Sequence, residues 1–176
     1  EDSGHFADVL ARASSSSNTN VGMMGETFKY VAPLAGAMGV SIEDTAVAIG
    51  LMANAGIKAG QAGTSLRAML ANLTEPTEEA GLLMEELGIS MTDMDGNVKS
   101  LDTVIGDLRT AFSGLSEAEK VSAASTIAGK EAMSGLLAIV NASDADFATL
   151  TAAIADSDGA AQQMATTMQD NLAGAL

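Results

Sequence analysis

Two pairs of adjacent glutamates, Glu78/Glu79 and Glu85/Glu86, are the side chains in this sequence that could perform acid–base chemistry. Paired carboxyl groups on either side of a glycosidic bond are the catalytic groups of most glycoside hydrolases. Neighbouring residues of a helix diverge by about 100° around its axis, so neither pair converges on a substrate. We therefore interpret Glu78 and Glu79 as favourable charges at a helix start, and Glu85 and Glu86 as part of a solvated face.

The segment DMDGNVKSLD, residues 93–102, has part of the ligand spacing of a calcium-binding EF-hand loop. Asp93, Asp95 and Asp102 fall at ligand positions, and Gly96 falls at the position of the sharp turn. Met91 stands where the first ligand should be, and the last position carries Asp instead of the usual bidentate Glu. The pattern therefore favours an ordinary Asp-Gly turn, and we predict no metal site.

Nucleophilic catalysis and phosphate binding have little support in this sequence. The chain has no cysteine, and its single histidine, His5, lies near one end, which argues against a nucleophile activated by a histidine base. Lys58 precedes the glycines at positions 60 and 63, whereas the lysine of a phosphate-binding loop follows them. We predict no catalytic residue and no cofactor, and assign Gly56, Gly60 and Gly63 to a tight reversal with close helix approach.

The composition predicts a core of small and flexible side chains. Hydrophobic residues make up 47% of the chain but aromatic residues only 3%, and 11 methionines are present. Such a core favours thin helices packed closely together, with methionine filling irregular gaps. The apolar runs Tyr30 to Ile42 and Thr45 to Ile57 are shorter than the roughly 20 residues that a membrane-spanning helix needs, so buried helices explain them better.

The charge balance argues against direct nucleic-acid binding. The chain carries 23 acidic and 8 basic residues, a formal net charge of −15, and the basic residues stand singly along the sequence. Phosphate contacts require clustered lysine and arginine, so we predict a solvated acidic surface instead. The chain starts with Glu1 and has no signal-peptide pattern, and we interpret it as a piece of a longer protein.

Apolar residues at helical spacing and capping residues predict most of the elements. Residues 21–38 form one pattern, in which Pro33 should kink or divide the helix. Ser41 and Asp44 match a capping box before a helix over about residues 42–55. A glycine corner then leads into a helix with Leu66, Met69, Leu70 and Leu73 on one face, and Thr77 caps a helix that should stop at Gly88 in the left-handed conformation.

The second half of the chain is predicted to continue as helices after one short ribbon. Ile89 to Lys99 flank the Asp95-Gly96 turn, which predicts a two-stranded β-hairpin. Helical patterns follow over residues 101–112, 116–129 and 133–140, and Asp144 caps a last segment whose apolar stripe breaks around residues 156–159. This stripe only loosely approaches heptad spacing, because Ser157 and Asn171 interrupt it, so we expect it to pack back on its own domain.

The sequence thus predicts an all-α fold: an elongated bundle of about seven helices with one small hairpin near residues 89–99. We expect three regions in the chain. Residues 1–20 form a flexible or helical lead, residues 21–143 form the helical core domain with the hairpin, and residues 144–176 form a C-terminal amphipathic helical segment that leads into further sequence.

The stretch ANAGIKAGQAGTSLRAMLANLTEPTEEA, residues 53–80, contains a Gly-Ile turn, an Ala-Gly-Thr-x-Leu-Arg helix opening and a Leu-x-x-Pro-Thr exit. In this order these motifs resemble the core of phage tail tape-measure proteins. The similarity extends over roughly residues 21–140, through GVSIEDTAVAIGLMANAGI, LMEELGISMTDMDGNVKSLDTVIGDL and TIAGKEAMSGLLAIV. Ala128 departs from the family pattern, which has Phe before the glycine. The residues that form the structural turn signature are Gly56, Gly60, Gly63, Pro76, Gly96 and Gly129.

The resemblance implies a non-enzymatic structural segment that acts in tail assembly, tail-length determination and genome delivery of a phage or prophage. It implies a location in the lumen of the virion tail, and in the host cytoplasm during assembly. The implied partners are other copies of the chain, tail-tube subunits and tail assembly chaperones. Direct nucleic-acid binding by this segment is not expected, and membrane contact would be confined to genome ejection.

Two other functions remain open at this stage. In the first, Tyr30 to Ile57 is an apolar hairpin with Glu43 and Asp44 at its tip, and it inserts into a membrane during genome ejection. In the second, the chain is a domain associated with cell-wall hydrolysis, a role that some tape-measure proteins assign to separate domains and that would depend on a carboxylate such as Glu79.

Overall fold

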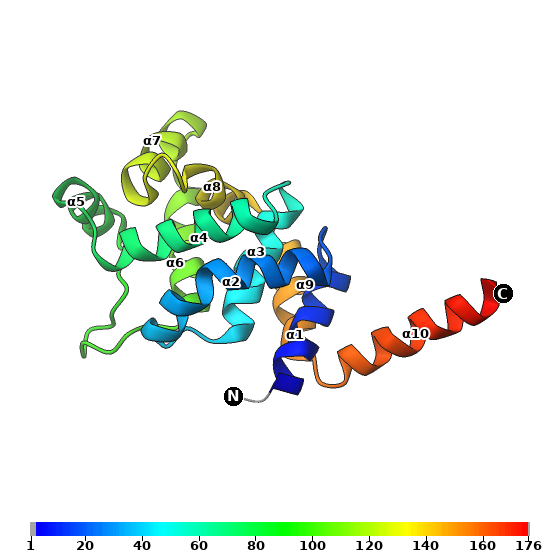
Figure 1. Cartoon of the computed structure of the whole chain (residues 1–176). Coiled ribbons are helices and arrows are strands. Elements are labelled where there is room, and N and C mark those ends of the chain that lie inside the picture. Colours follow the sequence, from blue (N-terminus) through cyan, green and yellow to red (C-terminus); the bar gives the residue numbers. More distant parts are fainter. Residues whose placement is uncertain (1–2, 176) are drawn as a thin grey trace.

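The computed structural model describes residues 3–175, which fold into ten helices (Figure 1). They are α1 (Ser3–Ser16), α2 (Val21–Met38), α3 (Ile42–Asn54), α4 (Ala59–Thr74), α5 (Glu78–Leu87), α6 (Leu101–Ser113), α7 (Glu117–Ala128), α8 (Met133–Asn141), α9 (Asp144–Ala155) and α10 (Ala160–Ala175). The predicted all-α class is confirmed for these residues. The expected number of about seven helices is wrong, because the N-terminal lead is itself a helix and the last segment is divided into α9 and α10.

Side chains at the helix starts explain where several of these helices begin. A side-chain oxygen of the residue before the helix accepts a backbone N–H at α2, α3, α5, α6, α7 and α9. Ser116 and Glu119 form a complete capping box at α7. Such caps satisfy N–H groups that the first turn of a helix leaves without a partner, each worth about 1 kcal/mol.

Two of the predicted caps differ in detail from the structure. Ser41 accepts the N–H of Asp44 at 3.1 Å, but the Asp44 carboxylate does not complete the capping box. It accepts the N–H of Asp102 at 3.2 Å instead, and so joins the starts of α3 and α6. At α9 the cap is Ser143 and not Asp144, whose carboxylate lies 2.8 Å from the Arg109 guanidinium.

The chain passes through Pro33 without dividing α2. Pro33 lies inside one continuous helix that ends at Gly39, where the backbone is left-handed with φ 73°. Gly88 ends α5 in the same conformation with φ 74°, which confirms that prediction. Glycine carries no Cβ and adopts this conformation without steric cost.

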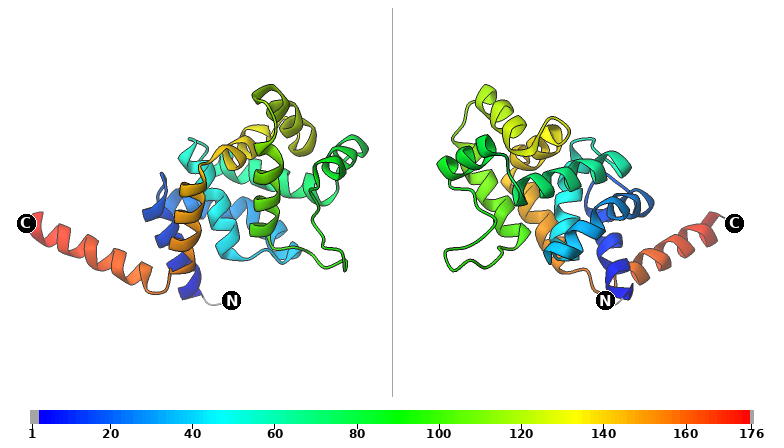
Figure 2. Two further views of the ribbon diagram at one scale, coloured as in Figure 1. Left: turned by 180° about the vertical axis from the view of Figure 1, so that it is seen from behind. Right: turned by 60° about the vertical axis from the view of Figure 1, so that its left-hand side comes forward.

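Helix α3 lies at the centre of the core and is surrounded by other helices (Figures 1 and 2). Every residue from Thr45 to Ala53 is buried, and α3 contacts α1, α2, α4, α6, α8 and α9. A helix that is apolar on all sides is stable only when it is enclosed. The two apolar runs noted in the sequence, which lie on α2 and α3, therefore belong mainly to the protein core.

The predicted β-hairpin near residues 89–99 does not form. Among residues 3–175 the structure has no strand, and this segment contains a single antiparallel bridge between Thr92 and Val98. The side chain of Asp93 accepts the N–H groups of Asp95 and Asn97, both at 2.9 Å, so a side-chain turn replaces most of the strand pairing. Met94 and Val98 are exposed, and the segment has no buried face that would stabilise two strands.

Helix α10 contacts α1, but most of it projects from the body of the molecule, whereas α9 packs into it (Figure 1). Leu150 and Ile154 of α9 are buried, but Ala160 is the one buried residue of α10 among those described. The carboxylate of Asp8, on α1, accepts the N–H groups of Gly159 and Ala161, both at 3.0 Å. The expectation that the last segment packs back on the domain is therefore right for α9 and wrong for most of α10.

Candidate functional site: the glycine corner and the loop beside it

The glycine corner connects α3 to α4 by a sharp reversal. Gly56 has φ 89°, a conformation that suits glycine, and the N–H of Ile57 donates to the carbonyl of Met52 at 2.9 Å. Ala59, the first residue of α4, also has a positive φ of 54°. Its carbonyl accepts the hydroxyl of Thr27 at 2.8 Å, and this bond connects the corner to α2.

Gly60 and Gly63 lie on the face of α4 that packs against α2. A Cβ at Gly63 would lie 2.6 Å from the Cβ of Tyr30, far closer than two carbon atoms can pack. A Cβ at Gly60 would lie 3.2 Å from Oε1 of Glu26 and 3.5 Å from the Tyr30 ring. The two glycines therefore allow α2 and α4 to form the most extensive contact between any two helices in residues 3–175.

The other residues of the predicted turn signature are distributed along the chain. Pro76 lies between α4 and α5, and Gly96 lies in the exposed loop with φ 82°. Gly129 ends α7 with φ 83°, beside Asn72 of α4, whose amide donates to the carbonyl of Ala128 at 2.6 Å. The structure thus gathers Gly56, Gly60, Gly63 and Gly129 around α4, while Pro76 and Gly96 lie outside this contact region.

Sequence reasoning missed two further glycines at helix crossings. A Cβ at Gly50 of α3 would lie 2.7 Å from the Leu150 side chain of α9. A Cβ at Gly135 of α8 would overlap Ser65 of α4 and lie 3.1 Å from the methyl group of Met52. Both glycines stand inside apolar helical patterns rather than at their ends, and this position is a signal that could have identified them.

Sequence reasoning also missed Arg109, whose guanidinium connects α6 to the junction of α8 and α9. It donates to the carbonyl of Ile139 at 2.8 Å and to the carboxylate of Asp144 at 2.8 Å, and lies 4.9 Å from the centre of the Phe147 ring. Its side chain is only 9% exposed. A planar cation that satisfies a helix C-terminus and stacks on an aromatic ring fixes the geometry of this junction.

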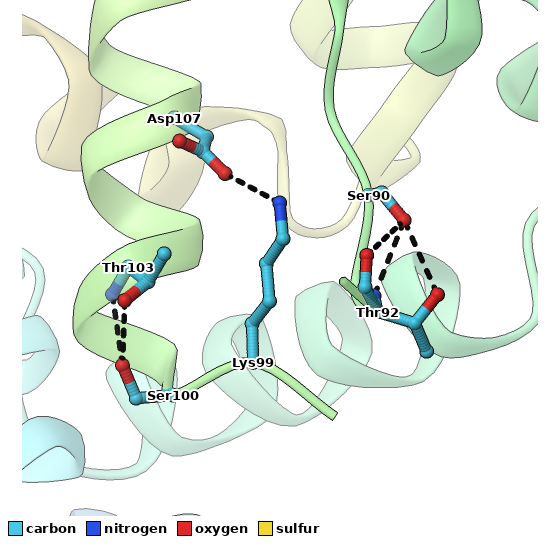
Figure 3. Close-up of polar contacts among 6 residues, drawn as sticks. All are labelled: Ser90, Thr92, Lys99, Ser100, Thr103 and Asp107. Atoms are coloured by element: carbon cyan, nitrogen blue, oxygen red, sulfur yellow. Dashed lines mark hydrogen bonds and ion pairs between the residues drawn. The ribbon is translucent and has the colours of Figure 1, made fainter. Parts of the chain in front are cut away.

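The loop between α5 and α6 is held at both ends of its exposed tip (Figure 3). On one side, the Ser90 hydroxyl donates to the carbonyl of Thr92 at 2.9 Å. On the other, the ammonium of Lys99 lies 2.9 Å from Asp107 of α6. Ser100 then accepts the N–H of Thr103 at 3.2 Å and caps α6.

These contacts present Met94 as a fully exposed side chain at the tip of an ordered loop. Hydrogen bonds from the backbone N–H groups of Asn97 and Asp95 lower the pKa of Asp93 below its ordinary value, although desolvation by the surrounding loop acts in the opposite direction. Asp93 therefore stays ionised at neutral pH and keeps the turn closed. The Asp93 carboxylate is thus bonded to the loop's own backbone and shapes the turn.

The carboxylates considered for chemistry do not converge in the structure. Glu78, Glu79, Glu85 and Glu86 are all exposed on α5. Among residues 3–175 there is no group of three histidine, cysteine, aspartate or glutamate residues that could hold a metal ion. His5, on α1, is hydrogen-bonded to Glu43 of α3.

Asp44 and Asp102 are the carboxylates that the fold brings near each other, at the starts of α3 and α6. Burial, and then the charge of Asp44, raise the pKa of Asp102 above its ordinary value. This perturbation follows from helix packing, since the N–H of Asp102 donates to Asp44.

A hollow of about 630 Å³ lies between α3, α8 and the start of α9. Within the described part of the chain, one ionisable residue, Asp146, lines this hollow.

No single helix among residues 3–175 is both long and apolar enough to cross a membrane. Helices α8 and α9 pass this test of length and composition only as a pair, and they are bent by 94° at their junction.

Residues 1–129 match the family model described as "Phage-related minor tail protein", and the chain belongs to this family. The resemblance to tape-measure cores seen in the sequence is confirmed by this match and by two relatives.

Both relatives match almost the whole of this chain. A "Tape measure protein" of Pneumococcus phage Dp-1 is 46% identical over 173 residues, which is 98% of this chain and 15% of the relative. A "Probable tape measure protein" of Escherichia phage P2 is 35% identical over 173 residues, which is 97% of this chain and 21% of the relative. The chain thus spans between about a seventh and about a fifth of these relatives. No solved structure matches it.

Proposed function

We propose that this chain is a folded, non-enzymatic segment of a phage tail tape-measure protein that acts in tail assembly, tail-length determination and genome delivery. The observation that carries this proposal is the similarity over nearly the whole chain to two proteins with that name. The family match to minor tail proteins supports a structural role in the tail. The glycine corner contributes by holding the domain together and not by catalysis.

The dimensions of the chain argue that it is not itself the measuring element. An α-helix rises about 1.5 Å per residue, so 176 residues in one continuous helix would reach only about 260 Å. The short helices of residues 3–175, most of which pack around a common core, extend over much less. We infer that the length information lies in other parts of the tape-measure protein and that this domain performs a separate task.

The proposed location is the lumen of the virion tail, with the host cytoplasm as the site of assembly. The proposed partners are other copies of the chain, tail-tube subunits and assembly chaperones. We further propose that residues 21–143 are the core domain, with residues 1–20 and 144–176 as helical flanks. Helices α1 and α9 of these flanks both contact α3.

The proposal is tested by analysing purified intact tails of a phage whose tail protein carries this segment. Mass spectrometry of protease-treated tails should recover peptides from residues 3–175, and an antibody to the folded segment should label tails only after they are opened. Tails of normal length that contain no peptide of this segment would defeat the proposal. The purified segment should also leave cell-wall material intact, and hydrolysis that is lost on Glu79→Gln would favour the enzymatic alternative.

A further inference from the structure

The single histidine of the chain, His5, lies where three elements meet. It belongs to α1, and its Nε2 is hydrogen-bonded to the carboxylate of Glu43 at the start of α3. Its Nδ1 lies 3.9 Å from a carboxylate oxygen of Asp158, in the turn that leads from α9 into α10. Helix α1 packs against α3, α9 and α10 (Figures 1 and 2). One imidazole ring therefore connects α1 both to the central helix and to the base of α10.

Both ring nitrogens of His5 face carboxylate oxygens. An ionised carboxylate only accepts hydrogen bonds, and a neutral imidazole carries a single N–H. A neutral His5 can therefore direct an N–H at Glu43 or at Asp158, and it turns the lone pair of its other nitrogen toward a negative oxygen. The imidazolium has an N–H on each nitrogen and a positive charge that attracts both carboxylates. The arrangement thus fits the protonated ring.

Further carboxylates lie close to His5. Asp8, one turn further along α1, accepts the N–H groups of Gly159 and Ala161, both at 3.0 Å. The bonds from Ala161 and Gly159, and less strongly the charge of His5, lower the pKa of Asp8 below its ordinary value. Asp156, at the end of α9, is exposed. When His5 loses its proton, the positive charge between these carboxylates disappears.

The other surroundings of His5 do not replace this charge. On α2, the contact with α1 includes aromatic rings, since Phe28 lies edge-on to Phe6 with 5.1 Å between the ring centres. On α3, the carboxylate of Asp44 is directed at α6. Within residues 3–175, α10 carries one charged residue, Asp170, which lies about three helical turns from its start.

Few groups beyond its first turn fix the direction of α10. Ser157 and Ala160 are 2% and 6% exposed and anchor the turn before it, whereas the side chain of Asp158 is 97% exposed. Gly159 then has φ 81°, a conformation that glycine adopts without steric cost. No described residue of α10 after Ala160 is buried, although α10 contacts α1. A change in the bonds at this turn can therefore alter the direction of the whole helix.

We propose that His5 is a pH-dependent switch: the protonated ring holds the α9–α10 turn against α1, and loss of the proton releases Asp158 and lets α10 pivot at Gly159. The switch is engaged on the acid side of the histidine titration and released on its alkaline side. Asp8 caps α10 in both states, because its lowered pKa keeps it ionised at neutral pH. The inference goes beyond the proposed function and does not depend on it.

The test measures the direction of α10 in the whole 176-residue chain, which contains no cysteine and accepts two spin labels without background. Ala71→Cys on α4 and Gln169→Cys on α10 are both exposed positions for the labels. Histidine side chains change their charge between about pH 5 and 8, so pulsed electron paramagnetic resonance is recorded across this range. The distribution of label distances should move or broaden as the pH rises, and the change should follow the titration of one proton.

Two substitutions of the histidine should fix the switch in its two states. His5→Gln, which carries no charge, should show the alkaline distance distribution throughout the pH range. His5→Lys, which stays positively charged, should show the acid distribution throughout. Circular dichroism should give the same helix content for both variants, because the His5 side chain is 38% exposed and is not part of the core.

Asp158→Asn tests the partner, and Asp156→Asn in the same turn is the matched control. Asp158→Asn should abolish the change of distance with pH, while NMR spectra should show that His5 still titrates. Asp156→Asn removes the same charge two residues away and should leave the change intact. Equal loss in both variants would overturn the proposal, because net charge and not this ion pair would then control α10.

A distance distribution that does not change with pH in the labelled chain would also overturn the switch, as would a change that persists in His5→Gln. These results are obtained in solution, whereas the proposed function is decided by the presence of the segment in purified tails. A chain without the switch that is found in tails would leave the proposed function standing. A working switch in a chain that is absent from tails would defeat the proposed function alone.

Discussion

Ala59 adopts a left-handed backbone conformation, with φ 54°, which is unusual for a residue other than glycine. This conformation costs an L-residue roughly 1–2 kcal/mol, whereas glycine adopts it freely. Glycine lowers the stability of the folded state by about 0.5–1 kcal/mol relative to alanine, because it has greater conformational freedom in the unfolded chain. Ala59→Gly should therefore raise the free energy of unfolding by about 0.5–1 kcal/mol, measured by urea denaturation.

Ala71→Gly is the matched control, because Ala71 is exposed in the interior of the same helix. Here glycine relieves no strain, so the free energy of unfolding should fall by about 0.5–1 kcal/mol. The opposite signs of the two substitutions distinguish backbone strain from a general effect of glycine on α4. A loss of stability in both variants would show that Ala59 is not strained.

Asp8 should make the attachment of α10 dependent on pH. Its carboxylate accepts the N–H groups of Ala161 and Gly159, and these bonds lower its pKa below the ordinary value, against a smaller opposing effect of burial. A group whose folded pKa is depressed stabilises the fold fully above its unfolded pKa, about 4 for aspartate. This stabilisation is lost as the pH falls through the lower, folded pKa.

The amide resonances of Gly159 and Ala161 in NMR spectra should report this titration directly. Both should shift together with a midpoint below about pH 4, and Asp8→Asn should abolish the shared midpoint. Asp93 and Glu119 also have lowered pKa values, so a global unfolding curve in acid would combine several groups. Asp170→Asn, which changes an exposed carboxylate of α10, should leave both resonances titrating as before. Amides that titrate unchanged in Asp8→Asn would show that Asp8 does not cap α10.

At the scale of elements, the packing of α2 on α4 depends on the absence of a side chain at Gly63. A methyl group there would lie 2.6 Å from the Tyr30 Cβ, which cannot move without moving the α2 backbone. Gly63→Ala should lower the free energy of unfolding by about 1–3 kcal/mol, the usual range for overpacking. Chemical denaturation measures this directly.

Gly36→Ala is a suitable control for this prediction, because Gly36 lies within α2 and a Cβ there meets nothing within 4 Å. The free energy of unfolding of this variant should rise by about 0.5–1 kcal/mol, because alanine has the higher helix propensity. The free energy of unfolding of Gly60→Ala should lie between those of Gly63→Ala and Gly36→Ala. The added Cβ would lie 3.2 Å from the carboxylate of Glu26, which is at the end of a flexible side chain. If Gly63→Ala were as stable as Gly36→Ala, the close approach of α2 and α4 would not be required.

The helix boundaries could be predicted where the interactions are local. The caps by Thr77 and Ser116 and the stop at Gly88 each depend on residues within one helical turn. The bonds from Asp102 to Asp44, from Arg109 to Ile139 and from Gly159 to Asp8 join residues 58, 30 and 151 positions apart. No periodicity in a single sequence contains such pairings. The cap by Ser41 is therefore right, the capping role predicted for the Asp44 carboxylate is wrong, and Arg109 was missed.

The prediction of a β-hairpin at residues 89–99 is wrong because it also depends on contacts that the local sequence does not contain. Asp95-Gly96 is a true turn signal, and Gly96 does have a positive φ of 82°. Whether a turn becomes a hairpin depends on whether a buried face stabilises its strands, and Val98 is 64% exposed. The glycine corner could be found because it combines a turn with amphipathic helices, whereas its partner Tyr30 could not be identified from spacing.

For the molecule as a whole, close helix crossings take the place of large aromatic side chains. Gly50, Gly63 and Gly135 bring α3 to α9, α4 to α2 and α8 to α4, and the core between them is mainly alanine, leucine, isoleucine and valine. A core built in this way has little spare volume, so it tolerates added atoms poorly at the crossings. The domain should therefore be either folded or unfolded as one unit.

This cooperativity leads to a prediction about whole tails. In a phage whose tape-measure protein carries this segment, Gly63→Leu should unfold the domain and reduce the number of complete tails, because an unfolded segment can no longer present its surfaces for assembly. The tails that do form should keep their normal length. A helical ruler changes by about 1.5 Å per residue deleted, and Gly63→Leu removes no residue from it.

Electron microscopy of lysates provides both quantities, the number of tails and their length distribution. Gly36→Ala is the control and should affect neither, since it adds a methyl group in open space on the same pair of packed helices. A uniform population of shorter tails with Gly63→Leu would contradict the separation of folding from measurement, because this domain would then set the length itself. Unchanged numbers together with unchanged length would instead show that tails assemble without the folded domain, and its role would have to lie after assembly, in genome delivery.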